Sequence, residues 1–352
     1  MKAYLIVAVG LFVATAKASA GVDVSKQPAE PAVAGARSVM LDVARAGARL
    51  VAVGERGIVL VSDDSGRTWK QSPSPTSASL TKVFFVTPDL GWAVGHFGIV
   101  LDTQDGGRTW ERQLDGVRAA KLTLRYFEDL SQKAGGDPQA LAKQVSAAKQ
   151  LVDDGPDKPL LDVFFDTPQH GFVVGAYNLI FATSDGGKSW VPYQDHVDNP
   201  RGLHLYAIRQ IGTDWYIAGE QGLLLKSVDG GQSFHAQTSP YDGSFFGVTP
   251  GPGSDVLAFG LRGNVFRSTD NGRTWKPAKT SVSPTWNAGT LLNGYVYLGG
   301  EDGQVDRLGR DSEADHLVTT SSAAPITGMA LAPDGALVLS SMGGMNRIPL
   351  DR

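Results

Sequence analysis

Five aspartates lie in near-copies of one short motif, and a carboxylate set among glycines can act as a general acid or base, bind a metal ion or hold a turn. The copy at residues 103–110 has the sequence TQDGGRTW. The five aspartates are Asp64, Asp105, Asp185, Asp229 and Asp270. One active site needs one constellation of side chains, whereas an architecture uses the same joint many times. The repetition therefore predicts a structural role.

The residue types in this motif are typical of a tight turn between two strands. We expect the Asp105 carboxylate to accept hydrogen bonds from backbone N–H groups just ahead of it, while Gly107 supplies a positive φ. Thr109 adds a hydroxyl, and the aromatic residue that follows is large enough to wedge between neighbouring sheets. That aromatic residue is Trp69, Trp110, Trp190 or Trp275, with Phe234 in the remaining copy. A calcium loop is excluded because the D-x-[DN]-x-[DN]-G pattern with its distal Glu is absent.

The spacing of the motifs predicts the fold. The aspartates are 41, 80, 44 and 41 residues apart, and 80 is one further repeat plus an insertion of 39 residues. Each unit contains short runs rich in Val, Ile, Phe and Leu, bounded by Gly, Pro and Asp, which are typical of strands and hairpins. Four strands per ~40–45 residues indicate a β-propeller. We therefore predict an all-β fold, a seven-bladed β-propeller, with the motif at the turn between the third and fourth strands of a blade.

The last repeat contains only three apolar runs, in residues 326–350. We expect the segment at residues 22–37 to supply the fourth strand of this blade. Such a strand would close the ring and remove an open sheet edge.

The insertion, at about residues 115–158, changes the hydrophobic period from two to about 3.6. Asp137 before Pro138 is typical of a helix N-cap followed by proline at the first helical position, and Gly155 with Pro156 ends the second helix. The sequence therefore predicts an inserted α-helical hairpin. Any apolar surface that it leaves open would serve as a docking site or as a lid over the central channel.

Composition and the N-terminus limit the classes of function. The chain has 352 residues, 42% of them apolar and 19% charged, and a net charge of −4, which argues against a nucleic-acid-binding protein. It has no cysteine, which excludes disulfides, thiolate metal sites and a lipid-modified cysteine. Residues 1–20 have the charged start, apolar run and Ala-Ser-Ala ending of a signal peptide. We expect a single mature domain at residues 21–352 without a transmembrane segment, exported and, in a bacterium, periplasmic.

The turns between second and third strands are the candidate binding positions, since their residues vary where the surrounding frame repeats. They lie on one face of a propeller together with the links between blades, and the aspartate motifs lie on the other. The candidate partner-binding residues are Arg56, His96, Phe97, Tyr177, Asn178, Gln221 and Arg262. Exposed aromatics and Arg are enriched at binding hot spots, which favours Phe97 and Tyr177. Two alternatives stay open: these are merely solvent-facing turn residues, or Glu55, Glu220 and Glu301 surround a cation.

The motif S/T-x-D-x-G-x-T/S-W resembles the Asp-box, or BNR repeat, of sialidases and other propellers. The fuller unit, with VFF before TP, VG at the end of the second strand and DGGRTW, resembles the photosystem II stability and assembly factor family of seven-bladed propellers over about residues 39–279. This resemblance implies a non-enzymatic protein that binds other proteins during the assembly of membrane complexes. For bacteria without photosynthesis it implies a periplasmic accessory factor whose partner is a membrane-associated complex or a transporter component.

The enzyme alternative is a sialidase-like glycoside hydrolase. It would need an Arg-Ile-Pro motif ahead of the first Asp-box, three arginines and a Tyr-Glu pair. Arg347-Ile348-Pro349 occurs here, but at the C-terminal end. We therefore predict no enzymatic activity, no catalytic residue, no cofactor and no metal site. A propeller that binds a glycan or a small ligand stays open as an alternative, because fold alone does not decide function.

Overall fold

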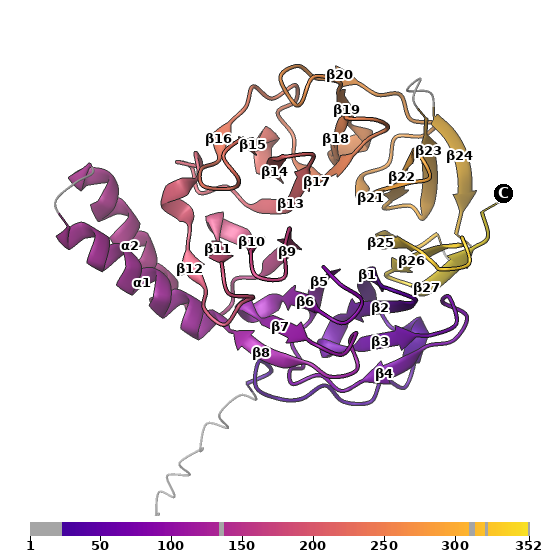
Figure 1. The fold of residues 1–352 in the computed structure, drawn as a ribbon, viewed down its shortest axis with the longest axis horizontal. Helices are drawn as coiled ribbons and strands as arrows, with labels where there is room; N and C mark the ends of the chain where they lie inside the picture. The colour runs from indigo at the N-terminus through magenta and orange to yellow at the C-terminus, as the bar shows by residue number, and fades with distance from the viewer. Residues whose placement is uncertain (1–22, 134–136, 310–313, 321–322, 351–352) are drawn as a thin grey trace, which may run out of the picture.

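The chain forms a ring of antiparallel sheets around a central channel (Figure 1). The computed structural model describes residues 23–133, 137–309, 314–320 and 323–350. Within these residues, six sheets have four strands and one has three, which confirms the predicted seven-bladed propeller. The predicted signal peptide lies outside the described residues. In the described part of the chain, no helix has the length and apolar character needed to cross a membrane.

Each blade is built from strands that follow one another in the sequence. Blades 1 to 3 are β1 (Met40–Ala46), β2 (Arg49–Gly54), β3 (Val59–Ser62) and β4 (Lys70–Ser72); β5 (Leu80–Phe85), β6 (Gly91–Gly95), β7 (Val100–Thr103) and β8 (Glu111–Leu114); and β9 (Leu160–Phe165), β10 (Gly171–Gly175), β11 (Ile180–Thr183) and β12 (Val191–Pro192). Blades 4 and 5 are β13 (Leu205–Ile211), β14 (Asp214–Gly219), β15 (Leu224–Ser227) and β16 (His235–Ala236); and β17 (Phe245–Pro250), β18 (Val256–Gly260), β19 (Val265–Ser268) and β20 (Lys276–Pro277). Blades 6 and 7 are β21 (Trp286–Leu292), β22 (Tyr295–Gly300), β23 (Gln304–Leu308) and β24 (Ala314–Thr319); and β25 (Ile326–Leu331), β26 (Leu337–Ser341) and β27 (Gly344–Ile348).

The hydrophobic core lies between neighbouring blades. The second strand of a blade has its two faces covered by the adjacent blades, so all five residues of β6 are buried. Trp92 of this strand stacks on Phe165 of blade 3, with ring centroids 3.4 Å apart. Clusters of this kind follow one another around the ring, each shared by two blades. The propeller is therefore held together by a series of inter-blade contacts.

The five Asp-boxes form turns between third and fourth strands. In blade 2, Asp105 accepts hydrogen bonds from the backbone N–H groups of Arg108 and Thr109, both at 2.9 Å, and from the Thr109 hydroxyl at 2.7 Å. The Thr103 hydroxyl donates to Asp105 and accepts from the buried N–H of Gly107, each at 2.9 Å. The same bonds from the two hydroxyls recur at the other four boxes.

The hydrogen bonds at these turns lower the pKa of the Asp-box carboxyls. At Asp270, bonds from the Thr274 side chain and backbone and from the Ser268 hydroxyl lower the pKa to about 2. The pKa of Asp64 is also lowered, chiefly by the Thr68 hydroxyl. These carboxyls are therefore held ionised as acceptors, which is the protonation state that a turn requires.

The aromatic residue of each Asp-box packs between its own blade and the preceding one. Trp110 is 6% exposed and lies in a cluster with Val51 of blade 1 and Val83 of blade 2. Phe234 fills the equivalent place between blades 3 and 4. The boxes therefore join one blade to the next.

No strand of residues 23–37 joins blade 7, so the predicted fourth strand of this blade is wrong for the part of the segment that the structure describes. The described part of this segment, from residue 23 onward, runs beside blade 1, where Ala29 N–H donates to Ser74 O and Ala32 N–H donates to the side chain of Gln71. Its turn at Gly35–Arg37 then contacts β27 of blade 7. Blade 7 keeps three strands. Closure comes from apolar packing between Met40 of blade 1 and Val338 of blade 7, within one buried cluster.

The insertion forms the predicted helical hairpin, with α1 (Gly116–Gln132) and α2 (Pro138–Asp154). Asp137 caps α2 by accepting from Gln139 N–H, as the sequence indicated, and Asp115 caps α1 through Arg118 N–H. Figure 1 shows the hairpin outside the ring, beside blade 3, and α1 contacts β12. The alternative of a lid over the channel is therefore wrong.

Candidate functional site

One face of the propeller carries the turns between second and third strands together with the links between blades. The two are joined by hydrogen bonds such as His96 N–H to Ser79 O, 2.9 Å, and Ala176 N–H to Pro159 O, 3.1 Å. On the opposite face, Gly106 of an Asp-box donates to Asp89 O in the turn between first and second strands. We call the first of these the turn face. It is the face predicted to bind a partner.

The turns on this face hold bulky residues in the left-handed conformation. The residues are Arg56, Phe97, Tyr177, Gln221 and Arg262, with φ between 51° and 60°. Each is followed by a second residue of positive φ, as in a type I′ turn, whose twist matches that of the flanking strands. Asn or Gly adopts this conformation at the least cost, and other residues are found there much less often. The same conformation therefore recurs at the equivalent turn of five blades.

The structure separates the predicted binding residues by exposure. Arg56, His96, Gln221 and Arg262 are exposed. Tyr177 is 61% exposed and lies beside His204, with ring centroids 4.7 Å apart.

Two of the predicted residues are less available. Phe97 is half-buried and packs on the cluster between blades 1 and 2, so the expectation of an exposed aromatic there is wrong. Asn178 is 8% exposed, and its Oδ1 accepts from Asn199 at 2.9 Å.

The glutamates of these turns do not form a cation site. Glu220 accepts from His204 N–H at 3.2 Å, and Glu301 accepts from Thr285 N–H at 3.3 Å, each within its own blade-to-blade link. Among the described residues, no three His, Cys, Asp or Glu side chains are grouped so that they could hold a metal ion. The alternative of a ring of glutamates around a cation is therefore wrong.

A groove of about 690 Å³ lies between the hairpin and the turn face of blade 3. We call it the hairpin groove. One wall is formed by α1 and α2, with Phe127 and Ala148 buried. The other wall is formed by the turn at Tyr177 and by the link from blade 3 to blade 4, residues 194–202. Arg201 of this link lines the groove and donates to Gln221 Oε1 at 3.0 Å. The structure thus gathers Tyr177 and Asn178, and through Arg201 also Gln221, at one place.

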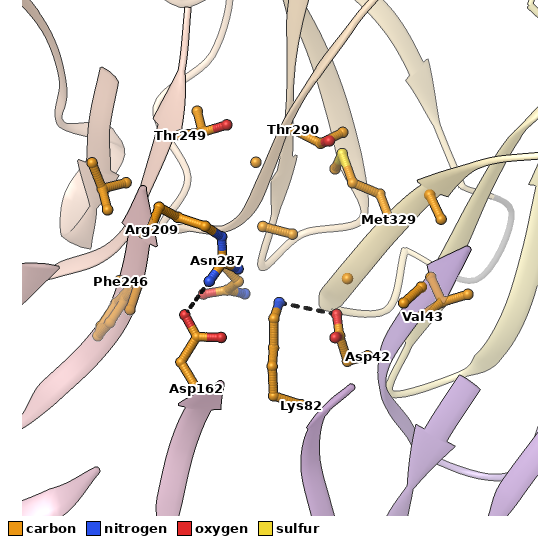
Figure 2. Close-up of a pocket in the computed structure, with 18 of the residues that line it drawn as sticks. Asp42, Val43, Lys82, Asp162, Arg209, Phe246, Thr249, Asn287, Thr290 and Met329 are labelled. Carbon is orange, nitrogen blue, oxygen red and sulfur yellow. Dashed lines mark hydrogen bonds and ion pairs between the residues drawn. The ribbon is translucent and has the colours of Figure 1, made fainter. Parts of the chain in front are cut away.

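A second hollow, of about 620 Å³, is the central channel, which is lined by the first strands of the blades. Figure 2 shows its two ion pairs, Lys82 with Asp42 at 3.1 Å and Arg209 with Asp162 at 2.5 Å. Strand register places Asp42, Lys82 and Asp162 at equivalent positions of blades 1 to 3. The other four blades have Ala207, Gly247, Ala288 and Gly328 there. The charged side chains of the channel therefore come from the first strands of blades 1 to 3 and, with Arg209, from blade 4.

The channel carboxylates link neighbouring blades. Asp42 accepts from Val83 N–H at 3.0 Å, and Asp162 accepts from Ile208 N–H at 2.9 Å, so each bonds to the first strand of the next blade. Burial raises the pKa of Asp42, while the Lys82 ammonium and the Val83 N–H oppose that rise. Both carboxylates already accept from a cation and a backbone N–H, so neither is placed as a free general acid or base.

Arg347 of the Arg-Ile-Pro motif also has a structural place. It donates to Ser65 O in the first Asp-box at 3.0 Å and pairs with Asp334 at 2.5 Å. Arg67 of the same box pairs with Asp334 at 2.6 Å. These contacts join blade 7 to blade 1, on the face opposite the turn face.

Sequence reasoning missed Gln194, Asn199 and Arg201 in the hairpin groove and the ion-paired residues of the channel, Asp42, Lys82, Asp162 and Arg209. The groove residues lie in a polar link that resembles any loop. A signal for the channel existed, because Asp42, Lys82 and Asp162 each interrupt an apolar first strand at the same place in the repeat.

The fold and the repeats define a BNR/Asp-box β-propeller. Residues 141–240 match the model of the photosynthesis system II assembly factor YCF48 family, and residues 266–277 match the BNR/Asp-box repeat. The photosystem II assembly lipoprotein Ycf48 of Synechococcus sp. (strain CC9902) is 33% identical over 126 residues, which are 35% of this chain and 38% of that protein. The resemblance to the photosystem II assembly factors is thus confirmed, while the matched stretch spans well under half of that relative.

Solved structures agree on the fold. A structure described as YCF48 bound to D1 peptide superimposes with a TM-score of 0.63 at 16% identity, covering 90% of this chain and 95% of that one. Virginiamycin B lyase from Staphylococcus aureus superimposes with a TM-score of 0.66 at 10% identity, covering 92% and 99%. Since propellers of this shape include both a peptide-binding protein and an enzyme, function has to be argued from the sites of this chain.

Proposed function

We propose that this protein is a non-enzymatic, exported binding protein that acts as an accessory or assembly factor for a membrane-associated complex or a transporter component. The relatives found by sequence are assembly factors, and one related structure contains a bound peptide. The channel carboxylates Asp42 and Asp162 each accept from a backbone N–H of the next blade, so they are not free to act as an acid and base pair. These observations favour binding over catalysis.

The turn face is the observation that carries the proposal. It holds left-handed Arg, Phe, Tyr and Gln side chains where Asn or Gly would cost less, and the hairpin adds a groove at its edge. Tyr177, 61% exposed at the groove, is the residue of this face that best fits a hot spot, since aromatic side chains contribute large contact areas.

The test is affinity capture from the native membrane and periplasmic fraction, followed by mass spectrometry. One variant replaces residues 117–155 by a short Gly-Ser link. The link can close because a side chain placed on Gly116 would lie 2.9 Å from Pro156, so the two ends of the hairpin are adjacent. A second variant is Tyr177→Ala. Its matched control is Tyr295→Ala, because Tyr295 is 42% exposed and begins β22 of blade 6, on the face opposite the turn face.

We expect the wild type and Tyr295→Ala to enrich the same membrane-associated partner. Tyr177→Ala should weaken capture, by about 1 kcal/mol or more for a hot spot, and the deletion should weaken it further while remaining folded by circular dichroism. Turnover of sialosides or other glycosides, or undiminished capture by both variants, would refute the proposal. A mature chain that retains residues 1–20 would refute the part that concerns export.

A further inference from the structure

The hairpin groove has an apolar floor. Phe127, Ala148 and Leu179 line it and are each no more than 5% exposed, and Leu151 adds a half-buried side chain. Its volume of about 690 Å³ lies within the usual range of binding pockets. Because the gain from apolar burial scales with the area removed from water, the partly exposed Leu151 is the part of this floor that a ligand side chain would cover.

Side-chain amides lie in the same groove. Gln194 is only 7% exposed, and its Oε1 atom is buried without a hydrogen-bond partner among the described residues. A buried carbonyl without a donor raises the free energy of the unbound protein. Gln194 lines the groove, so its side-chain amide is close enough to pair with a ligand that enters it. Asn178 and Asn199 also line the groove, where Asn199 donates to Asn178 Oδ1 at 2.9 Å.

The rim of the groove carries unpaired positive charge. Lys158 is paired with Asp154 at 3.1 Å and with Asp157. Lys143 and Arg201, in contrast, have no carboxylate partner among the described residues and donate only to Pro200 O and Gln221 Oε1. Two cations without counter-ions beside an apolar floor are complementary to a ligand that carries negative charge.

Taken with the proposed function, on which this inference rests, the geometry points to a specific ligand class. We propose that the hairpin groove binds an extended peptide segment of a partner protein that carries acidic side chains. Its backbone pairs with the amide of Gln194, its apolar side chains cover the partly exposed Leu151, and its carboxylates lie near Lys143 and Arg201. Tyr177 packs on the segment where it leaves the groove.

The experiment uses the full mature protein and labelled pools of short synthetic peptides. The acidic pool combines Gly, Ser, Ala, Val and Leu with Asp and Glu, and two matched pools replace the acids by Asn and Gln or by Lys. Binding is measured by fluorescence anisotropy. We expect the acidic pool to bind, the amide pool to bind about tenfold more weakly, and the lysine pool not to bind. Added salt should reduce the difference between the first two pools.

Two pairs of variants on the exposed side of α2 test the location. Ala147 lines the groove and Ala142 does not, and both are exposed, so Ala147→Trp should block binding while Ala142→Trp should not. Lys143→Gln should weaken the acidic pool several-fold, and Lys149→Gln, an exposed lysine of the same helix outside the groove, should leave it unchanged. Equal effects within a pair would overturn the inference.

Gln194→Met separates a ligand-binding role from a structural one. Methionine is similar in size but has no buried carbonyl to satisfy. We expect weaker binding of the acidic pool with no fall in the melting temperature. A fall in melting temperature without a change in binding would assign Gln194 to the fold and contradict the inference.

The outcomes distinguish this inference from the proposed function. If the wild type and Ala147→Trp capture the same membrane-associated partner equally well, the proposed function is supported and the proposed groove ligand is refuted. If the acidic pool binds but no membrane-associated partner is captured, the proposed groove ligand is supported and the proposed function is refuted. If no pool binds and Ala147→Trp converts a dimer to a monomer in light scattering, the groove is covered by a second copy, and the inference is wrong.

Discussion

The hydroxyl that opens each Asp-box should matter more to stability than the aspartate that names it. In blade 2, Thr103 is 2% exposed, and its Oγ1 is the acceptor for the buried N–H of Gly107 at 2.9 Å. The donors to Asp105, the N–H groups of Arg108 and Thr109, are exposed. Water can replace the carboxylate at these two donors, but it cannot reach the N–H of Gly107.

The expected cost follows from this difference. Thr103→Val keeps the shape of the side chain and leaves the Gly107 N–H buried without an acceptor, which costs about 1–3 kcal/mol. Asp105→Ala exchanges the bonds from the exposed backbone of Arg108 and Thr109 and from the Thr109 hydroxyl for bonds to water, and it removes the acceptor of the Thr103 hydroxyl. Because the Gly107 N–H keeps its acceptor, this variant should cost less than Thr103→Val, about 1 kcal/mol. Thr103→Ser, which keeps the hydroxyl, should stay close to the wild type.

The assay is urea unfolding followed by tryptophan fluorescence, with midpoints compared at equal slope. The same pair in blade 3, Thr183→Val and Asp185→Ala, repeats the comparison, since Gly187 N–H donates to the Thr183 hydroxyl at 2.8 Å. If the aspartate variants are destabilised as much as the hydroxyl variants in both blades, the carboxylate is the main support of the turn and this reasoning is wrong.

Three further predictions concern the joints between blades. Trp110→Ala should cost about 3–5 kcal/mol because it empties a buried site. Trp110→Phe should cost much less, since Phe234 fills the same place in blade 4. Calorimetry would compare the melting temperatures of the two variants. Asp270 has a folded pKa of about 2, so its stabilisation is complete above its unfolded pKa of about 3.9 and is lost as the pH falls toward 2. Asp270→Asn should therefore flatten the change in unfolding midpoint across this pH range. Asp42→Ala leaves Lys82 and Val83 N–H without their acceptor and should cost about 3 kcal/mol. Asp42→Asn keeps an acceptor for Val83 N–H and should cost less. Equal unfolding midpoints for these two variants would contradict a stabilising role of the bond from Asp42 to blade 2.

Local sequence patterns were sufficient to predict the structure of the repeated parts of this protein. A period of about 41 residues, Gly and Asp at each turn and an aromatic residue after it indicate a blade, because each blade is built from consecutive strands joined by short turns. The hairpin was likewise predictable from Asp137, Pro138 and Gly155, since helix caps depend on residues next to them in the chain. The number of blades and the place of the Asp-boxes followed from these local signals.

Placement across the ring was decided only by the tertiary structure. The N-terminal segment bonds to blade 1, through Ala32 and Gln71, and its turn at Gly35–Arg37 contacts β27, while blade 7 has three strands among the described residues. No local pattern could show this, since it depends on which of two distant edges offers the better contacts. For the same reason the sequence named Tyr177 but could not bring it beside Gln194 and Arg201. Those residues lie in another link, and only the docking of the hairpin against blade 3 places them around one groove.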